Sequence, residues 1–230
     1  MFEGINPFDK KPLVTIITPT YKREDQLYSA IMSVANQTFT DFEHLTISDG
    51  WFDDEYFWQE IRQNLSKTNP DIFNRFFFCS LPWNHKDVGS TPKNVGLMLA
   101  KGKYVAYLDD DNEYLPRHIE TLVNLIEEKN VDFVFSSTLL RNQSDPTTDI
   151  GTRVANAPAY GHIDTSEILH KKEVPFKFGF WRNSDFTDIH PWGKPTGFYG
   201  TDWDLISRWL NAGATWAHSN EITLIYYYRR

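Results

Sequence analysis

The sequence predicts an α/β fold with a mostly parallel central sheet that helices cover on both faces. Short apolar runs alternate with helical patterns through the first half of the 230-residue chain, which is typical of such sheets. The first run, 13–18, is β-branched and is followed by Pro19, as expected for a short buried strand. Hydrophobic residues make up 40% of the chain and aromatic residues 16%, so a packed core is expected and disorder of the whole chain is excluded.

The other elements of the first half each have a signal of their own. The turn signal Asp49-Gly50 ends the second strand, and Gly102 is placed to end the third helix. Apolar residues recur at helical spacing in the first helix and in the helix that begins at Pro116. After 13–18, strands are predicted at Phe42–Ser48, Phe76–Cys79 and Lys103–Leu108, and helices at Glu24–Asn36, Asp53–Leu65, Thr91–Ala100 and from Pro116 onward.

The second half differs in character. Val131–Leu140 and Ile222–Tyr228 are predicted strands, and Asp204–Asn211 is a short predicted helix. Residues 142–162 are polar and lack periodicity, so we expect a mobile loop there. Residues 176–203 are aromatic and interrupted by Gly and Pro, which makes this segment a candidate wall of a binding site.

Polar side chains follow three of the predicted strands at the point where each strand ends. They are residues 18–23, Asp49 and the acidic triplet 109–111. Ligands of open parallel sheets bind beyond the carboxyl ends of the strands. The sequence therefore predicts one site at this edge of the sheet.

The formal net charge is −8, whereas a protein that binds nucleic acid normally has a basic surface. Nucleic acid is therefore not expected as a partner. Cys79 is the one cysteine, so no intrachain disulfide can form, as suits a reducing compartment. Residues 1–12 lack the apolar run of a signal peptide, and no stretch approaches the roughly 18 apolar residues of a membrane span. We expect a cytoplasmic location, with peripheral membrane contact left open.

The triplet Asp109-Asp110-Asp111 allows two interpretations. Adjacent carboxylates after an apolar strand are costly unless a cation neutralises them, and Mn²⁺ or Mg²⁺ prefers such oxygen ligands. An anionic nucleotide would need such a cation on a protein of this charge. The alternative is a solvated turn, or a cap for the helix near Pro116.

Five segments of the chain carry a resemblance to a known family. They are VTIITPTYKR at 14–23, SVANQTF at 33–39, FEHLTISDG at 42–50, KNVG at 93–96 and GKYVAYLDDD at 102–111. TDWDL at 201–205 and YYYR at 226–229 add shorter matches. In this order they resemble the inverting family 2 glycosyltransferases, well over residues 13–130 and in patches beyond.

The resemblance implies a single GT-A domain over residues 1–230, with a donor half at about 12–115 and an acceptor half at about 116–230. It implies transfer of a sugar from a nucleotide-diphosphate donor, with a UDP-sugar favoured, dependent on Mn²⁺ or Mg²⁺. The acceptor would be a saccharide, a lipid-linked molecule or another hydroxyl compound, as in polysaccharide or glycoconjugate biosynthesis.

The resemblance also assigns site residues. Asp49 would accept a hydrogen bond from the base, Asp110 would contact the ribose and Asp111 would bind the metal. Two departures weaken the match: Ser48 stands where the family usually has an acid, and Lys93 stands where it commonly has Arg. Lysine keeps the charge but loses the bidentate fork. The residues assigned to the nucleotide sugar are Thr18, Pro19, Tyr21, Arg23, Asp49, Lys93, Asp109 and Asp110.

Sugar transfer needs a base that deprotonates the acceptor hydroxyl. The resemblance assigns this role to Asp202, which precedes an apolar helix, with Asp204 ranked second. Spacing alone favours Asp202 as the N-cap of that helix, and the two roles are compatible. His218, shortly before the last strand, is a candidate second metal ligand, and Trp181 and Trp192 are candidate acceptor-binding residues.

Two other enzyme classes use α/β sheets but fit this sequence less well. A sugar-1-phosphate nucleotidyltransferase or a Rossmann dehydrogenase would need a Gly-rich loop after the first strand, and residues 19–23 contain no glycine. A catalytically inactive nucleotide- or carbohydrate-binding module of the same fold remains the alternative from another class. The presence of both Asp111 and Asp202 argues for an active enzyme.

Overall fold

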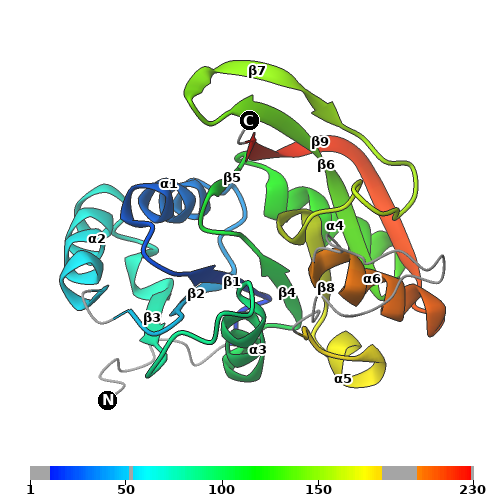
Figure 1. Ribbon diagram of the computed structural model, residues 1–230, viewed down its shortest axis with the longest axis horizontal. Coiled ribbons are helices and arrows are strands. Elements are labelled where there is room, and N and C mark those ends of the chain that lie inside the picture. The colour runs from blue at the N-terminus through cyan, green and yellow to red at the C-terminus, as the bar shows by residue number, and fades with distance from the viewer. Residues whose placement is uncertain (1–10, 52–53, 183–200, 229–230) are drawn as a thin grey trace.

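The computed structural model describes residues 11–51, 54–182 and 201–228 (Figure 1). The strands are β1 Val14–Thr20, β2 Phe42–Ser48, β3 Phe76–Ser80, β4 Tyr104–Tyr107, β5 Asn112–Tyr114, β6 Phe133–Asn142, β7 Asp145–Arg153, β8 Ile168–Lys171 and β9 Trp216–Tyr228. The helices are α1 Glu24–Ala35, α2 Asp54–Thr68, α3 Ser90–Leu99, α4 His118–Lys129, α5 Val174–Phe178 and α6 Thr201–Asn211, with 3₁₀ turns η1 Phe73–Arg75 and η2 Thr165–Glu167.

The strands form one sheet in the order β3-β2-β1-β4-β8-β6-β9-β5, and β7 pairs with the outer part of β6. The strands β3, β2, β1 and β4 are parallel to one another. β8 then pairs antiparallel with both β4 and β6, while β6 and β9 are again parallel. The predicted α/β fold with a mostly parallel central sheet is therefore confirmed, and the shorter strands β5 and β8 complete the sheet.

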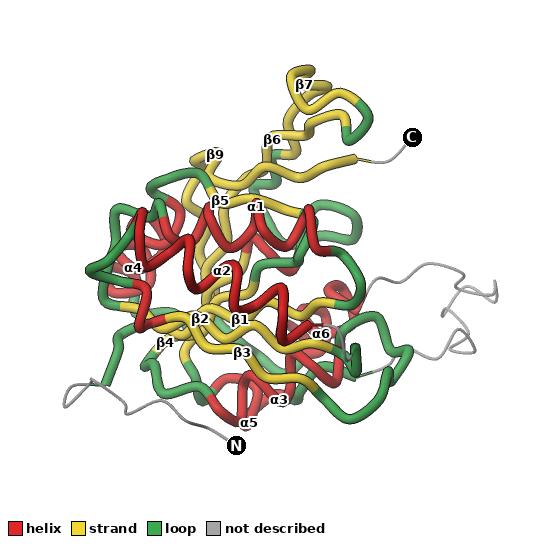
Figure 2. The backbone as a smooth tube through the Cα atoms, turned by 90° about the vertical axis from the view of Figure 1, so that its left-hand side faces the viewer, coloured by secondary structure: helices red, strands yellow, loops and turns green. Residues whose placement is uncertain are grey.

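Helices cover both faces of the sheet because successive residues of each strand point to opposite sides. Ile16 packs on one side with α1, α2 and α4, whereas Ile17 packs on the other with α3, α5 and α6. Figure 2 shows the two groups of helices on either side of the strands. Both isoleucines are fully buried, which explains why this strand reads as a continuous apolar run.

The sheet curls because of the path between β4 and β5. Only the segment Leu108–Asp111 joins these strands, yet β5 pairs with β9 at the far end of the strand order. The acidic triplet therefore connects β4, in the middle of the strand order, to β5 at its end, and lies between the parallel strands and the long strands β6 and β9. This position places it at the centre of the molecule (Figure 1).

The expectation of an irregular, mobile loop over 142–162 was wrong in part. Residues 145–153 form β7, which pairs antiparallel with β6 and projects with it from the body of the molecule (Figures 1 and 2). β7 is exposed along most of its length, so it has no buried face and shows no apolar alternation. Its threonines favour extended backbone, which is the signal that the sequence did contain.

Candidate active site

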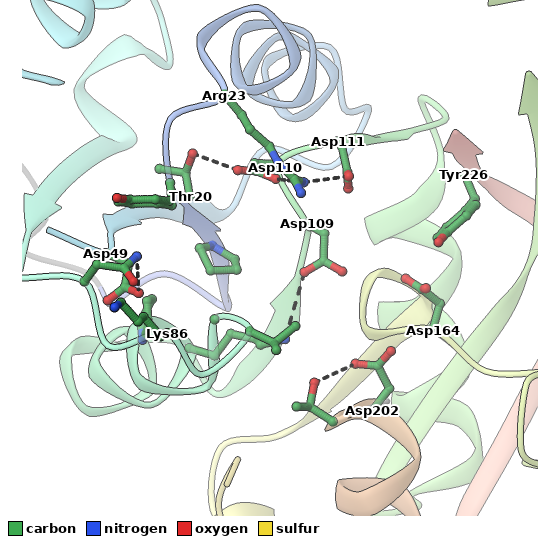
Figure 3. A pocket seen from close by; sticks show the side chains of 18 residues that line it. Thr20, Arg23, Asp49, Lys86, Asp109, Asp110, Asp111, Asp164, Asp202 and Tyr226 are labelled. Atoms are coloured by element: carbon green, nitrogen blue, oxygen red, sulfur yellow. Dashed lines mark hydrogen bonds and ion pairs between the residues drawn. The ribbon is translucent and has the colours of Figure 1, made fainter. Parts of the chain in front are cut away.

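A cavity of about 600 Å³ lies at the carboxyl ends of the parallel strands (Figure 3). It receives residues from the ends of β1, β2 and β4, from the loop after β3, and from α3, α6 and β9. Its lining consists of Pro19, Thr20, Tyr21, Arg23, Asp49, Asn84, Lys86, Val88, Gly89, Pro92, Lys93, Asp109, Asp110, Asp111, Asp164, Thr201, Asp202 and Tyr226. Most of the residues that the sequence assigned to the site thus lie around one space.

Arg23 links the carboxylates of Asp110 and Asp111. One guanidinium nitrogen, Nη1, lies 2.9 Å from Asp110 Oδ1 and 2.6 Å from Asp111 Oδ2. The hydroxyl of Thr20 donates to the other oxygen of Asp110 at 2.8 Å. Burial raises the pKa of Asp110, and Arg23 opposes this shift by stabilising the charged form. Asp110 is thereby fixed at the floor of the cavity, while Asp111 remains one quarter exposed.

Asp109 faces a different cation, the ammonium of Lys93 on α3. The Nζ–Oδ1 distance is 4.0 Å, and the Lys93 side chain is only 3% exposed. Burial raises the pKa of Asp109 well above its ordinary value, Lys93 opposes this, and the charges of Asp164 and Asp202 add to it. Three carboxylates from distant parts of the chain therefore lie close enough to influence one another.

Asp49, at the end of β2, accepts several hydrogen bonds from the loop after β3. The backbone N–H of His85 lies 3.0 and 3.1 Å from its two carboxylate oxygens, and the His85 ring Nδ1 lies 2.7 Å from Oδ1. The Asn84 amide donates to Oδ2 at 3.1 Å. The carboxylate is therefore held in one orientation on the cavity wall.

The loop that leads from β3 into α3 was missed as part of the site. Lys86, Val88 and Gly89 have positive φ values of 56, 55 and 78°, and all three line the cavity. Positive φ is unusual for a β-branched residue such as Val88, and strained backbone of this kind concentrates at binding sites. The available signal was position, because this loop follows the third parallel strand at the same edge of the sheet.

Asp202 lies in the first turn of α6, where its Oδ1 accepts a hydrogen bond from the Thr165 hydroxyl. Asp164 lies beside it and also faces the cavity (Figure 3). Sequence reasoning missed Asp164, which begins the turn η2: its carboxylate accepts from the Ser166 N–H, and Glu167 accepts from the Asp164 N–H. The spacing Asp164-x-x-Glu167 is a capping-box signal for such a turn.

Asp204, ranked second as a base, forms ion pairs with two arginines. Its carboxylate lies 2.6 Å from Arg182 and 2.8 Å from Arg208, and it does not line the cavity. Burial alone would raise its pKa, but the hydrogen bonds from both arginines outweigh this and lower it. Asp204 therefore ties α6 to the preceding segment, and Asp202 is the carboxylate of this helix that faces the cavity.

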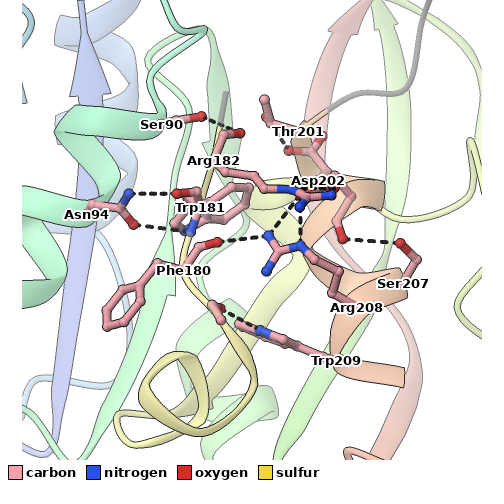
Figure 4. Close-up of polar contacts among 12 residues, drawn as sticks. Ser90, Asn94, Phe180, Trp181, Arg182, Thr201, Asp202, Ser207, Arg208 and Trp209 are labelled. Atoms are coloured by element: carbon pink, nitrogen blue, oxygen red, sulfur yellow. Dashed lines mark hydrogen bonds and ion pairs between the residues drawn. The ribbon is translucent and has the colours of Figure 1, made fainter. Parts of the chain in front are cut away.

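Trp181 was assigned to the acceptor site incorrectly. Its side chain is 3% exposed and packs edge-on against Tyr107, with the Lys93 ammonium 4.1 Å from its ring centroid. Its backbone N–H and C=O both bond to the Asn94 side chain (Figure 4). Trp181 thus packs against Lys93 and has no exposed ring face that a sugar could contact. Trp192 lies outside the described residues.

Thr18 and His218 also lie away from the cavity. Thr18 is fully buried and bonds to the ring of His44 at 2.8 Å, so Thr20 supplies the hydroxyl at the site instead. His218 bonds to Ser137 and Asn220 through its two ring nitrogens. The β9 residue that lines the cavity is Tyr226, and eight residues of strand place His218 on the order of 20 Å from it.

The cavity is rich in negative charge. Among the described lining residues, six carboxylates face three cations: Asp49, Asp109, Asp110, Asp111, Asp164 and Asp202 against Arg23, Lys86 and Lys93. No group of three or more His, Cys, Asp or Glu in the described part of the chain forms a ready-made metal site. Mg²⁺ commonly takes only one or two protein carboxylates and completes its shell with water and phosphate oxygens. The oxygen donors present fit a divalent cation bound in that way.

Comparison with known proteins places this fold and cavity in context. The family model described as "Glycosyl transferase family 2" matches residues 15–190. A β-1,3-glucosyltransferase from Campylobacter jejuni that acts on GalNAc(5)-diNAcBac-PP-undecaprenol is 34% identical over 167 residues, covering 73% of this chain. The chain spans about half the length of that relative, 49%.

Solved structures share the fold at low sequence identity. Staphylococcus aureus TarS in complex with UDP-GlcNAc has a TM-score of 0.65 at 16% identity, covering 94% of this chain and 59% of its own. The mannosyltransferase PcManGT from Pyrobaculum calidifontis, in complex with GDP-Man and Mn²⁺, has a TM-score of 0.68 at 14% identity, covering 100% and 61%. These neighbours have the GT-A fold, as this chain does. By the family match, the chain belongs to glycosyl transferase family 2.

Proposed function

We propose that this chain transfers a sugar from a nucleotide-diphosphate donor, with a UDP-sugar favoured, to an acceptor hydroxyl, with inversion at the sugar carbon. The observation that carries the proposal is the convergence of Asp49, the triplet 109–111 and Asp202 around one cavity. These residues come from β2, β4 and α6, and they are the types that base recognition, diphosphate binding and proton removal require.

The donor would lie across the ends of β1, β2 and β4. Asp49 supplies a buried acceptor for the N–H of a nucleobase, and Asp110 supplies one for ribose hydroxyls. The amino-terminal end of α3, with Gly89 and Pro92 on the cavity wall, would offer phosphate oxygens the partial positive charge of the helix. Its first N–H groups, those of Ser90 and Thr91, already bond to Asp87. Lys93 lies in the same helix, beside the triplet.

A divalent cation, Mn²⁺ or Mg²⁺, would be held by Asp111, with Asp109 nearby. When bound, it would act as a Lewis acid on the departing diphosphate. Arg23 pairs with Asp110 and Asp111 in the structure, so it would have to share these carboxylates with the cation or turn toward the phosphates. The excess of carboxylates in the cavity supports a requirement for a cation, because these carboxylates would otherwise repel the anionic diphosphate of the donor.

Asp202 would act as the general base. As the acceptor oxygen forms its bond to the anomeric carbon, the bond from that carbon to the phosphate oxygen breaks, and Asp202 takes the hydroxyl proton. Thr165 holds one oxygen of Asp202, which leaves the carboxylate oriented at the cavity. Asp204 is unsuited to this role because Arg182 and Arg208 occupy it.

A lipid-linked saccharide is the acceptor class that the Campylobacter jejuni relative suggests. That relative is named for an undecaprenyl-diphosphate-linked glycan, and its likeness covers most of this chain. No helix in the described part of the chain is long and apolar enough to cross a membrane.

The test is a thermal-shift and calorimetric screen of UDP-, GDP-, CDP- and dTDP-sugars, each with and without Mn²⁺. We expect one nucleotide class to raise the melting temperature in the presence of Mn²⁺, and Asp111→Ala to abolish most of the gain. The control variant Asp132→Ala removes a carboxylate that does not line the cavity and bonds to Thr215, so its melting temperature should rise with the nucleotide by as much as that of wild type. If no nucleotide stabilises the protein under any condition, the proposed activity is wrong and the non-catalytic carbohydrate-binding alternative is favoured.

A further inference from the structure

A second cavity adjoins the first and has no role in the donor chemistry. It has a volume of about 400 Å³ and lies between the β6–β7 hairpin, the chain after β7 and the end of β9. Its lining consists of Leu140, Thr152, Arg153, Val154, Gly161, His162, Tyr226 and Tyr228. A volume of this size is within the range of cavities that bind small organic ligands.

Tyr226 lines both cavities and therefore stands at their boundary. Figure 3 shows its hydroxyl directed toward the carboxylates of the first cavity, near Asp164. Burial, followed by the nearby charges of Asp164 and Asp111, raises the pKa of Tyr226 to about 12, so the hydroxyl stays protonated and can donate. One end of a ligand in the second cavity would thus lie at Tyr226, next to the first cavity that contains Asp202.

Arg153 brings no uncompensated charge to the second cavity. Its guanidinium lies 3.2 Å from the buried Glu167 and 3.6 Å from Asp164, and its Cζ lies 5.2 Å from the centroid of the Tyr226 ring. Because two carboxylates already neutralise this cation, an anionic ligand would gain little from it. The remaining lining is aromatic, aliphatic or uncharged and polar, apart from the imidazole of His162.

The walls suit a sugar ring. Tyr226 and Tyr228 contribute aromatic faces, and Tyr228 is 48% exposed despite its size. Such faces pack against the apolar C–H patches of a saccharide, while Thr152 and His162 offer hydrogen-bonding groups to its hydroxyls. Val154 and Tyr160, which are each 51% exposed, extend the nonpolar surface on the segment that follows β7.

We propose that the second cavity binds a neutral saccharide unit of the acceptor, next to the unit whose hydroxyl reacts in the first cavity. This proposal rests on the proposed function, because it assigns the acceptor to a place that adjoins the transfer site at Tyr226. The β6–β7 hairpin is then a recognition element, and the residues of the second cavity determine which glycan is extended.

The experiment is saturation-transfer NMR with neutral disaccharides, N,N′-diacetylchitobiose, cellobiose, lactose and maltose, each added to the protein with UDP and Mn²⁺. Thr152→Trp would fill the second cavity from an exposed position on β7, outside the donor cavity. Thr148→Trp is the matched control, since it places the same side chain on the same strand away from the cavity. Affinity for UDP is measured in parallel by calorimetry.

We expect wild type and Thr148→Trp to bind at least one disaccharide. Thr152→Trp should bind the same disaccharide roughly tenfold more weakly, while its affinity for UDP is unchanged. Tyr228→Ala should also weaken binding of the saccharide. Equal saccharide binding by Thr152→Trp and wild type would overturn the proposal, as would the absence of any saccharide signal on a wild-type protein that binds UDP. If the wild-type protein does not bind UDP, the proposed function itself is refuted.

Discussion

At the scale of single residues, the site assigns different partners to carboxylates that the sequence presents as equals. Arg23 pairs with Asp110 and Asp111, Lys93 lies beside Asp109, and Thr165 bonds to Asp202. A carboxylate paired with an arginine or lysine is held in place as an anion, whereas Asp202, bonded to a neutral hydroxyl, is the one proposed to accept a proton. Adjacent acids of one cluster can therefore carry separate roles.

Asp202→Asn tests the proposed base. The change keeps shape and the bond to Thr165 but removes the proton acceptor, so we expect kcat to fall by roughly 10²- to 10⁴-fold while affinity for UDP is retained. Steady-state kinetics and calorimetry measure the two quantities. Asp204→Asn is the control: it weakens the pairs with Arg182 and Arg208, so it should lower the melting temperature and leave kcat near wild type. Near-normal turnover of Asp202→Asn would contradict the proposed base and leave Asp202 with a structural role through its bond to Thr165; the alternative of an N-cap does not apply, because α6 already begins at Thr201.

At the scale of elements, helix α3 positions Lys93 because it packs closely on β1. A Cβ added at Gly96 would lie 2.6 Å from Ile17 Cγ2, so only glycine allows this approach. Both faces of the contact are buried, and Pro92 and Lys93 lie one turn earlier on the cavity side. The position of the cation thus depends on a residue that does not touch the cavity.

Gly96→Ala should separate α3 from β1. We expect a loss of about 1–3 kcal/mol in the free energy of unfolding, as for overpacking of a core, together with weaker binding of UDP. Denaturant titration and calorimetry give both values. Met98→Ala, at a position on α3 that is 57% exposed, should change neither by more than about 0.5 kcal/mol. A fully stable Gly96→Ala variant with wild-type UDP affinity would contradict this account of the contact.

At the scale of the whole molecule, the curl of the sheet gathers acids that are far apart in the sequence. The antiparallel pairing of β4 with β8 brings the end of β4 against the turn η2, and Thr165 of η2 bonds to Asp202 in the first turn of α6. Folding therefore brings Asp109 near the buried Asp164 and Glu167, with Arg153 as the cation beside the last two. Placing these groups together makes stability depend on pH.

Glu167 supplies a specific pH dependence. Its side chain is 1% exposed, and burial raises its pKa from 4.5 to about 7, although Arg153 opposes the shift. Between these values the folded state holds a proton that the unfolded state has lost, so stability falls as pH rises from about 4.5 to 7. We expect this group to contribute on the order of 1–3 kcal/mol to the change.

Denaturant titrations at several pH values between 4.5 and 8 would measure it. Glu167→Gln should flatten this part of the profile, because glutamine does not titrate. Glu128→Gln, in a side chain that is 68% exposed, should leave the profile unchanged. A Glu167→Gln profile with the same slope as wild type would show that Glu167 is charged throughout the range.

What the sequence determined by itself is local in origin. Periodicity and turn residues located the parallel strands, and their order along the chain placed Tyr21, Asp49 and Asp110 at one edge of a sheet. The bounds of β2 agree with the prediction, and the turn residues Asp49-Gly50 mark its carboxyl end. This half of the cavity needs no knowledge of long-range contacts.

The tertiary structure decided the other half. Which β9 residue reaches the cavity depends on the pairing of β9 with β5 and β6, and that register selects Tyr226 rather than His218. The packing of α3 on the segment after α5 turned Trp181 into a buried support for Lys93, and the turn η2 brought Asp164 beside Asp202. Such contacts join residues tens of positions apart, so local pattern cannot specify them, whereas strand register and core packing do.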